Sequence, residues 1–335
     1  MKTLLVIGAG GFIGGFIAKE GLRRGYDVWA GVRQSTSRRY LDDDRLHFAV
    51  FDYDDPQAVG RALQEYKPES GKWDCIIWNL GATKAVNYQT FNLVNYQYLR
   101  TFVEQLKAAS MLPERFLFMS SLSALGPADE KGYTPLSGAT VPNPNTRYGL
   151  SKIKAETYLS TQSELPWIIF RPTGVYGPHE QDYLMMIKSI DSHFDFGVGY
   201  RKQMLTFIYV DDLVAAMFDA LAAGDAVIHK KYIISEDRAY TQQEFRQIVA
   251  KRLGKKVVIP VVLPLWAAYL ASCVSEWWGK AHAKPSTLNR DKYKIMRQRN
   301  WACDISDARR DFGFSPQFPL ARGIDATVDA YLAQK

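Results

Sequence analysis

A tyrosine and a lysine four positions apart are the residues of this chain best suited to proton transfer. Tyr148 and Lys152 form the pattern Tyr-x-x-x-Lys, which places a phenol and an ammonium group on one face of a helix. A cation beside a tyrosine favours the phenolate and lowers the phenol pKa toward the working pH. We therefore predict that Tyr148 is a general acid or base with a lowered pKa.

The position of this pair along the chain supports a catalytic role, since the spacing alone occurs by chance. Tyr148 opens a predicted helix directly after residues 126–147, a long loop rich in Pro, Gly, Asn and Thr. That loop follows Ser120, Ser121 and Ser123, which stand at the C-terminal end of an apolar strand. Because ligands of open α/β sheets bind beyond such strand ends, we expect the pair at the ligand-binding edge of a sheet.

A glycine-rich turn near the N-terminus has the pattern of an anion site built from backbone. The apolar run Leu4–Ile7 predicts a buried strand, and Gly8, Gly11 and Gly14 follow it. Gly8 permits a sharp reversal, Gly11 lets a pyrophosphate approach the main chain, and Gly14 lets the next helix pack closely. The N–H groups and dipole at that helix start would hold the anion. The turn predicts dinucleotide binding, with an empty glycine turn as the alternative.

The end of the second predicted strand indicates which dinucleotide is bound. NAD sites usually carry an acidic residue there, whereas an arginine accommodates the 2′-phosphate of NADP. Here Asp27–Val32 is followed by Arg33 and by a donor-rich loop that includes Arg38, which can surround a phosphate. NADP(H) is therefore favoured and NAD(H) is possible, while an ordinary basic surface loop is the alternative. Asp52, after the third strand, could accept a hydrogen bond from the adenine amino group or be a turn residue.

Strand-like runs alternate with helical patterns through the first half of the chain. This alternation predicts an α/β fold with a doubly wound parallel sheet of the Rossmann type. We assign residues 1–175 to a dinucleotide-binding domain, with returns to it near residues 205–235. Residues 176–335 are assigned mainly to a smaller, interleaved substrate-binding domain. Further expected strands are Leu46–Phe51, Cys75–Trp78, Phe116–Met119, Trp167–Phe170, Leu205–Val210 and Tyr232–Ser235.

Composition places the chain among folded proteins that act on small molecules. It has 335 residues, of which 47% are hydrophobic, enough for a large core. The net charge of +7 is spread along the chain without a recognisable nucleic-acid motif, so no nucleic-acid partner is expected. The three cysteines lie far apart without C-x-x-C spacing, so we expect neither disulfides nor a metal site. A strand beginning at Lys2 or Thr3 leaves no room for a signal peptide, which predicts a cytoplasmic location.

An uncharged stretch, Val257–Ser275, is nearly long enough to cross a bilayer. Pro260 and Pro264 interrupt it and predict an extended segment followed by a helix. A buried or substrate-covering helix is the favoured interpretation, and an interfacial helix or a membrane span is the alternative. Because a basic run follows, peripheral membrane contact through residues 257–299 stays open. Four aromatic residues here would suit an apolar ring or acyl chain, or are core: Trp266, Tyr269, Trp277 and Trp278.

Taken together and in order, these motifs resemble the extended short-chain dehydrogenase/reductase family. The resemblance covers essentially the whole chain, and rests on the glycine turn, Ser120-Ser121, Tyr148-x-x-x-Lys152 and Arg171-Pro-x-Gly-Val-Tyr-Gly-Pro178. It implies that Tyr148 acts on the substrate oxygen, that Lys152 tunes it while binding the nicotinamide ribose, and that Ser121 donates to the same oxygen. Ser123 is the alternative to Ser121. Members of this family often form homodimers through the tyrosine helix, and we expect the same here.

The resemblance also implies further contacts. Lys84 is similar to a lysine of UDP-galactose 4-epimerases that approaches the cofactor, and Asn95 to an asparagine that steadies the active-site strand. His179, Glu180 and Tyr183 are candidate contacts at the rim of the substrate site. With the residues derived above, the predicted cofactor-binding set is Gly8, Gly11, Phe12, Ile13, Gly14, Arg33, Arg38, Asp52, Leu80, Gly81, Ala82, Lys84, Tyr148, Lys152, Pro172 and Val175.

Departures from the family patterns reduce the number of reactions and substrates expected for this chain. Leu122-Ser123 stands where dehydratases carry an Asp-Glu pair, so dehydration is not expected. Gly174 stands where nucleotide-sugar enzymes usually have Asn, and is similar to 3β-hydroxysteroid and sterol dehydrogenases. The strand before Arg33 resembles dihydroflavonol reductases, which use NADP, whereas Lys84 favours sugars.

We predict an NADP(H)-dependent oxidoreductase that interconverts a ketone and a secondary alcohol by a Tyr/Lys/Ser mechanism, on an apolar or ring substrate. One alternative is a nucleotide-sugar epimerase with tightly bound NAD. Another is a non-catalytic dinucleotide sensor, although a sensor would not need Ser121, Tyr148 and Lys152 together.

Overall fold

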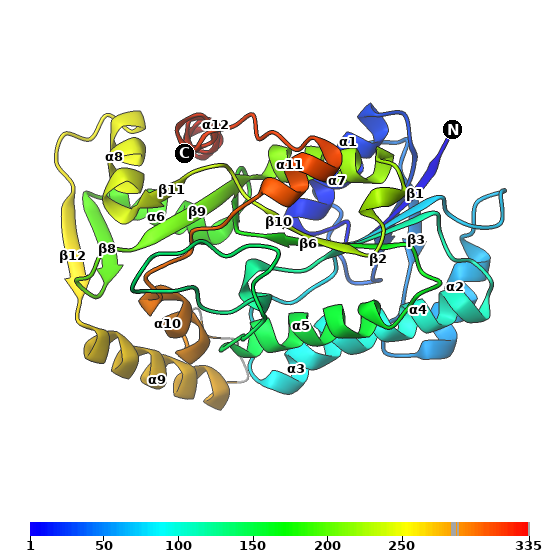
Figure 1. The fold of residues 1–335 in the computed structure, drawn as a ribbon, viewed down its shortest axis with the longest axis horizontal. Coiled ribbons are helices and arrows are strands. Elements are labelled where there is room, and N and C mark those ends of the chain that lie inside the picture. The colour runs from blue at the N-terminus through cyan, green and yellow to red at the C-terminus, as the bar shows by residue number, and fades with distance from the viewer. Residues whose placement is uncertain (283–285, 287, 334–335) are drawn as a thin grey trace.

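A seven-stranded parallel sheet forms the centre of the molecule (Figure 1). The computed structural model describes residues 1–282, 286 and 288–333. The strand order is β10-β6-β5-β4-β1-β2-β3, so the chain reverses its direction of travel between β1 and β4. This order confirms the predicted doubly wound α/β fold. The strands are β1 (Thr3–Ile7), β2 (Asp27–Val32), β3 (His47–Val50), β4 (Cys75–Trp78), β5 (Arg115–Met119), β6 (Trp167–Pro172) and β10 (Lys230–Ile234).

Helices cover both faces of this sheet because its central strands are apolar on both sides. In β1, Leu4 and Val6 join the core under one helical layer, while Leu5 and Ile7 join the core under the other. The first layer contains α1 (Phe12–Arg23), α7 (Val210–Ala222) and α11 (Ser306–Phe312). The second contains α2 (Pro56–Glu65), α4 (Tyr98–Ala108) and α5 (Arg147–Ser160).

The second half of the chain builds two small sheets at one end of the large one. The first has the order β11-β9-β7, and the second pairs β8 with β12 in parallel. Of the returns predicted near residues 205–235, only β10 joins the large sheet, because β9 pairs with β7 and β11 instead. The bounds are β7 (Gly174–Tyr176), β8 (Phe194–Val198), β9 (Met204–Tyr209), β11 (Ala239–Thr241) and β12 (Ile259–Leu263). The division of the chain near residue 175 stays a prediction.

Five helices surround these small sheets (Figure 1). They are α6 (Gln181–Asp191), α8 (Gln242–Arg252), α9 (Leu265–Ala281), α10 (Arg290–Arg297) and α12 (Leu320–Leu332). The uncharged stretch Val257–Ser275 is divided between β12 and α9. None of the helices in the described part of the chain has the length and hydropathy needed to cross a membrane. The membrane-span alternative for this stretch is therefore wrong.

Candidate active site

The turn between β1 and α1 has the shape of a dinucleotide cradle. Gly8 has a φ of 81°, a left-handed conformation that favours glycine. A Cβ on Gly14 would lie 2.7 Å from Ala9 Cα, so only glycine allows α1 to start this close to β1. Since α1 begins at Phe12 without a cap from any described side chain, the N–H groups of its first turn are available to an anion. The turn therefore fits a pyrophosphate.

The loop after β2 folds back onto this cradle. A Cβ on Gly15 would lie 2.7 Å from Tyr40 Cβ, and one on Gly10 would collide with Thr36. The sequence alone did not single out these two contacts, because both join positions more than 20 residues apart. The Arg33 N–H donates to Thr36 Oγ1 at 3.0 Å, which holds the start of the loop beside the glycine turn. The predicted 2′-phosphate loop therefore lies against the pyrophosphate cradle.

The other two polar residues predicted to bind the adenosine half have partners within the protein. The Arg38 guanidinium lies 4.0 Å from the centre of the Phe48 ring. Asp52 Oδ1 accepts from the Asp54 N–H at 3.1 Å, which is the turn role that was its alternative. Their contacts with the cofactor stay predictions.

Ser121 and Tyr148 meet where β5 ends and α5 begins. Thr146 caps α5 by accepting from the Gly149 N–H at 3.0 Å, so Tyr148 lies in the first turn of the helix, as predicted. The Ser121 side chain lies close enough to the Tyr148 phenol to lower its pKa. Ser123 instead donates its backbone N–H to Ser121 Oγ at 3.2 Å. Of the two candidate serines, Ser121 is the one whose side chain affects the Tyr148 pKa, and its contact with a substrate oxygen stays a prediction.

Lys152 lies behind this pair and is almost fully buried. Its Nζ donates to the Met119 carbonyl oxygen at 2.8 Å and lies 6.0 Å from the centre of the Tyr148 ring. Burial lowers the Lys152 pKa to about 8, although the charge of Glu156 opposes the shift.

The protonation of Tyr148 differs from the prediction. Burial raises the Tyr148 pKa to about 12, and the hydrogen bond with Ser121 offsets only part of this shift. The expected lowering by Lys152 is wrong for this arrangement, because the ammonium group is directed at the Met119 carbonyl and not at the phenol oxygen. Tyr148 is therefore a neutral acid at physiological pH.

Asn95 holds the chain after β4 against α5. It lies in a π-helical turn (Leu93–Gln97) that continues α3 (Tyr88–Asn92), and such turns often mark functional sites. Asn95 Oδ1 accepts from the Ala82 N–H at 2.8 Å, and its Nδ2 donates to the Ala82 carbonyl and to Ser151 Oγ. The stretch of Leu80, Gly81 and Ala82 therefore borders the catalytic helix, and a Cβ on Gly81 would lie 3.0 Å from Lys152 Nζ.

A buried ion pair that the sequence alone did not reveal fixes α5, the helix that carries Tyr148 and Lys152, to the sheet. Glu156, one turn after Lys152, accepts from Arg171 at 2.6 Å and from the Ser120 hydroxyl at 2.5 Å. The Lys231 ammonium lies 3.8 Å away. These contacts join α5 to the residue after β5, to the end of β6 and to the start of β10. The four-residue step between Lys152 and Glu156 could have indicated that the two side chains share one face of a helix. It could not have indicated Arg171 and Lys231, which come from distant strands.

Lys84 does not lie free at the predicted cofactor position. Its Nζ lies 2.7 Å from Asp182 Oδ1, and the Lys292 ammonium lies 3.0 Å from the other oxygen of the same carboxylate. Lys84 therefore links the loop after β4 to α6, and its approach to the cofactor stays a prediction. Pro172 and Val175 lie at the end of β6 and in β7, next to the strand ends where a nicotinamide is expected.

Tyr183 occupies the space beside Gly174. A Cβ on Gly174 would collide with the Tyr183 hydroxyl, so a longer side chain there would require the ring to move. Glu180 fixes the start of α6 by accepting from the Tyr183 N–H at 2.6 Å. His179, the third predicted rim residue, packs against Tyr40 with the two rings tilted and their centres 4.7 Å apart. Near it is a cavity of about 280 Å³, which Tyr148 does not line.

The model of the NAD dependent epimerase/dehydratase family matches residues 4–235, which include the glycine turn, Ser121, Tyr148 and Lys152. The chain belongs to this family. It is therefore an NAD(P)-dependent enzyme of the extended short-chain dehydrogenase/reductase type, as the motifs predicted.

Curated relatives of this family member differ in reaction. UDP-glucose 4-epimerase of Vibrio cholerae is 23% identical, with 99% of this chain and 96% of that protein covered. Ceramide reductase of Caulobacter vibrioides is 22% identical, with coverage of 99% and 95%. The 3β-hydroxysteroid dehydrogenase/decarboxylase isoform 1 of Arabidopsis thaliana is 26% identical over 57% of this chain and 46% of that protein.

A solved structure shares the fold over its full length. The UDP-glucose 4-epimerase of Thermotoga maritima superimposes with a TM-score of 0.78 at 18% identity, covering 99% of each chain.

Proposed function

We propose that this enzyme is an NADP(H)-dependent oxidoreductase that interconverts a ketone and a secondary alcohol. The contact between the Ser121 hydroxyl and Tyr148 carries the proposal, because both hydroxyl groups can donate to one carbonyl oxygen. When bound, the nicotinamide supplies or accepts the hydride. In the reducing direction Tyr148 passes its phenolic proton to the developing alkoxide and Ser121 orients the carbonyl, while the Lys152 ammonium would bind the nicotinamide ribose.

Two features support NADP(H) as the cofactor. The strand β2 ends at Val32 without an acidic residue, and Arg33 follows it. The loop that begins at Arg33 is held against the glycine turn, where the adenosine ribose of a bound dinucleotide and its 2′-phosphate would lie.

An apolar substrate is favoured over a nucleotide sugar. Tyr183 places an aromatic ring beside Gly174, where sugar-nucleotide enzymes usually carry a polar amide. Two relatives carry names that describe a ceramide reductase and a 3β-hydroxysteroid dehydrogenase. We therefore propose a lipid-like ketone as the substrate class of this chain.

NADPH oxidation with a panel of long-chain and cyclic ketones tests the proposal. We expect Tyr148→Phe to lower kcat/KM by roughly a hundredfold or more while NADPH affinity is kept, because only proton transfer is removed. Tyr158→Phe, on the same helix α5, is the matched control and should behave as wild type. Equal rates for wild type and Tyr148→Phe would rule out the assignment.

A nucleotide-sugar epimerase is the second candidate, favoured by the full-length match to the Vibrio cholerae enzyme. In that case the purified protein would retain bound NAD and convert a UDP-sugar without net consumption of cofactor. Incubating it with UDP-glucose and following both the sugar and the NAD(P)H absorbance separates the two candidates.

A further inference from the structure

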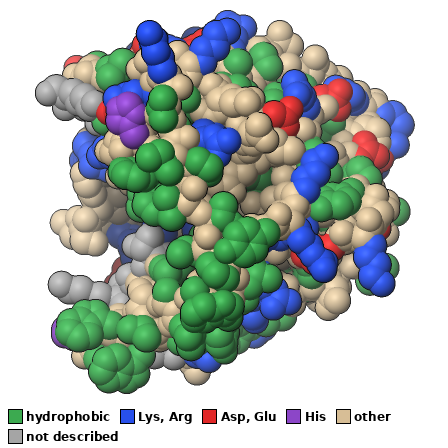
Figure 2. All heavy atoms as spheres, turned by 90° about the vertical axis from the view of Figure 1, so that its left-hand side faces the viewer, with side chains coloured by type: hydrophobic (Ala, Val, Ile, Leu, Met, Phe, Trp, Pro, Cys, Tyr) green, Lys and Arg blue, Asp and Glu red, His purple; other side chains and the backbone are tan. Residues whose placement is uncertain are grey.

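An apolar surface covers the outer side of α9 and the adjoining β8–β12 ribbon, and we refer to it as the α9 face. Figure 2 shows its hydrophobic side chains gathered on the end of the molecule that holds the small sheets. Apolar areas of this extent on a folded protein usually mark a binding surface. The exposed apolar residues are Phe194, Phe196, Ile259, Val262, Leu263, Leu265, Trp266, Tyr269, Leu270, Val274, Trp277 and Trp278.

Helix α9 has the reverse of the usual polarity of a surface helix. Its buried side consists of small or polar residues at four-residue steps, Ala268, Ser272 and Glu276. Its outward side carries the large apolar residues, with exposed fractions of 69% for Trp266, 65% for Val274 and 66% for Trp277. A helix adapted to water buries the large apolar residues instead. Core packing, one of the two favoured interpretations of these aromatic residues, is therefore wrong for Trp266, Trp277 and Trp278, whereas contact with an apolar substrate stays a prediction.

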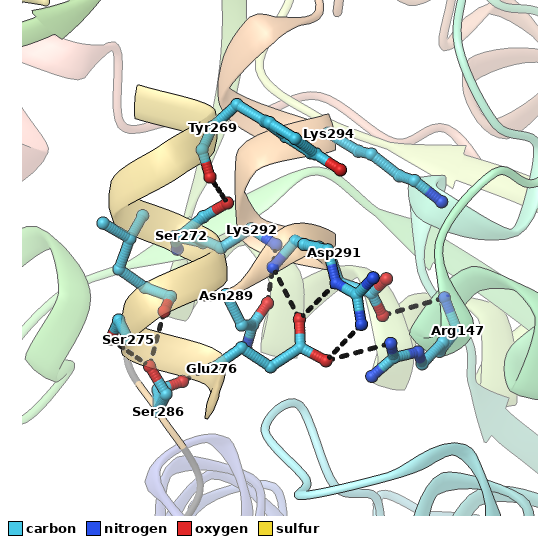
Figure 3. A network of polar contacts seen from close by, with 12 residues as sticks. Arg147, Tyr269, Ser272, Ser275, Glu276, Ser286, Asn289, Asp291, Lys292 and Lys294 are labelled. Atoms are coloured by element: carbon cyan, nitrogen blue, oxygen red, sulfur yellow. Dashed lines mark hydrogen bonds and ion pairs between the residues drawn. The ribbon is translucent and has the colours of Figure 1, made fainter. Parts of the chain in front are cut away.

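Polar contacts on the inner side fix α9 in this orientation (Figure 3). The Glu276 carboxylate lies 3.1 Å from Arg147 Nη2 and 2.9 Å from Arg290 Nε. Asp291, at the start of α10, accepts from the Arg147 backbone N–H at 2.9 Å. Arg147 is the first residue of α5 and directly precedes Tyr148. The inner side of α9 is thus tied to the catalytic helix, while its aromatic side is left facing outward.

The charges on this face have one sign. Within residues 192–202 and 255–279, the exposed lysines and arginines are Arg201, Lys202 and Lys256. The two carboxylates of these described stretches, Asp195 and Glu276, are buried and paired with arginines. An anionic surface would therefore meet cations without meeting an exposed carboxylate. Residues 283–285 and 287, which belong to the predicted basic run, lie outside the described residues.

We infer that the α9 face docks the enzyme on the surface of an anionic phospholipid bilayer. Tryptophan and tyrosine side chains favour the depth of the lipid headgroups, and apolar neighbours enter the acyl boundary. Each lysine or arginine near an anionic leaflet adds to the affinity. A second copy of this chain is a poorer occupant, because two such faces would bring their cations together, and the predicted dimer uses the surface of α5 instead.

Docking in this way has a consequence that rests on the proposed function. The side of α9 opposite to the bilayer contacts Arg147, next to Tyr148, so the active site would lie close to the membrane surface. A lipid-like ketone could then reach Tyr148 without crossing bulk water.

Vesicle flotation with the full chain tests docking independently of activity. We expect wild type to float with vesicles of phosphatidylcholine plus phosphatidylglycerol, and only weakly with phosphatidylcholine alone. Replacing both Trp277→Ser and Trp278→Ser should lower the partition coefficient at least about tenfold. Val141→Ser with Met185→Ser is the matched control, since both residues are exposed outside the α9 face. NADPH affinity and the unfolding temperature should stay unchanged in all of these variants.

The contribution of the exposed cations is tested with Lys202→Glu and Lys256→Glu in the same flotation experiment. Each is expected to weaken binding to the anionic vesicles about fivefold or more and to reduce its salt dependence. Lys67→Glu is the control, because Lys67 is exposed just after α2 and lies outside the α9 face. The proposal is overturned if wild type does not float with anionic vesicles, or if the tryptophan pair can be removed without loss. It is also overturned if the wild-type protein is a dimer that does not bind lipid and the two tryptophan substitutions convert it into a monomer. A failed ketone assay with intact flotation would reject the proposed substrate and leave docking standing.

Discussion

Burial, and not the neighbouring cation, determines the protonation of the residues that we assign to catalysis. The Tyr148 pKa is raised to about 12 and the Lys152 pKa is lowered to about 8, each because the charged form loses water. At pH 7 the pair is a neutral phenol and an ammonium group, which is the combination that carbonyl reduction requires. Glu156 keeps Lys152 from losing its proton at still lower pH, because its carboxylate lies behind the same helix face.

The pH dependence of carbonyl reduction should follow Lys152. Its ammonium is present below the lowered pKa of about 8 and is lost above it, whereas Tyr148 stays protonated up to about pH 12. We therefore expect kcat/KM for NADPH-dependent reduction to be level below about pH 8 and to fall toward higher pH. Steady-state rates between about pH 6 and 10 measure this. Lys84→Met should leave the inflection in place, and a level profile to about pH 10 would contradict the assignment.

Cofactor choice should depend on Arg33. Replacing Arg33→Ala removes a charge-assisted contact to a 2′-phosphate, so NADPH affinity should fall roughly tenfold or more while NADH affinity is unchanged. Fluorescence titration with both cofactors measures the ratio. Arg61→Ala, on the surface of α2, serves as the control. If the ratio of the two affinities is the same in Arg33→Ala as in wild type, the NADP(H) proposal is wrong.

At the scale of elements, contacts of the buried Glu156 carboxylate join α5 to Ser120 after β5, to β6 and to β10. The Arg171 and Glu156 side chains are 4% and 0% exposed, so each is stable there only because the other is present. The Arg171–Glu156 pair fixes α5 to β6, and Asn95 fixes α5 to the π-helical turn after α3. The helix is therefore positioned by tertiary contacts and not by its own sequence.

Breaking the buried pair on one side should be costly. Arg171→Met leaves the Glu156 carboxylate buried without its main partner, and we expect a loss of about 3–5 kcal/mol in the free energy of unfolding. The double change with Glu156→Leu should recover much of that loss, because no charge is left buried. Urea unfolding measures both. Arg23→Met, which breaks an exposed pair with Glu20, is the control and should leave the free energy of unfolding almost unchanged. A double variant less stable than Arg171→Met would contradict this explanation.

For the molecule as a whole, the large sheet and the end that holds the small sheets contribute different parts of the candidate site. The sheet presents the cofactor cradle and the catalytic helix, and the end that carries α9 and α10 closes against that helix through Arg147 (Figure 1). The α9 face and the outer side of α5 are the surfaces that we assign to larger partners. A cytoplasmic location and a homodimer through α5 stay predictions.

Dimerisation should be sensitive to the exposed side of α5. Leu150 lies on that helix and is 44% exposed, so Leu150→Arg should convert a dimer into a monomer by placing two cations in the contact. Light scattering of the purified protein measures the molar mass. Leu332→Arg, on the similarly exposed end of α12, is the control and should leave the dimer intact. A wild-type monomer, or a dimer unaffected by Leu150→Arg, would contradict the predicted interface.

The sequence by itself determined the features that depend on near neighbours. Strand ends, the glycine cradle, the start of α5 near Tyr148 and the Tyr148–Lys152 step all follow from side-chain period and turn chemistry within a few residues. The tertiary structure alone decided what depends on distant partners and on burial. Lys84 is paired across 98 positions with Asp182, Tyr183 fills the space at Gly174, and the Tyr148 pKa is raised. The outward tryptophans of α9 belong to the same class, because an apolar period shows that a helix has two sides but not which side meets the protein.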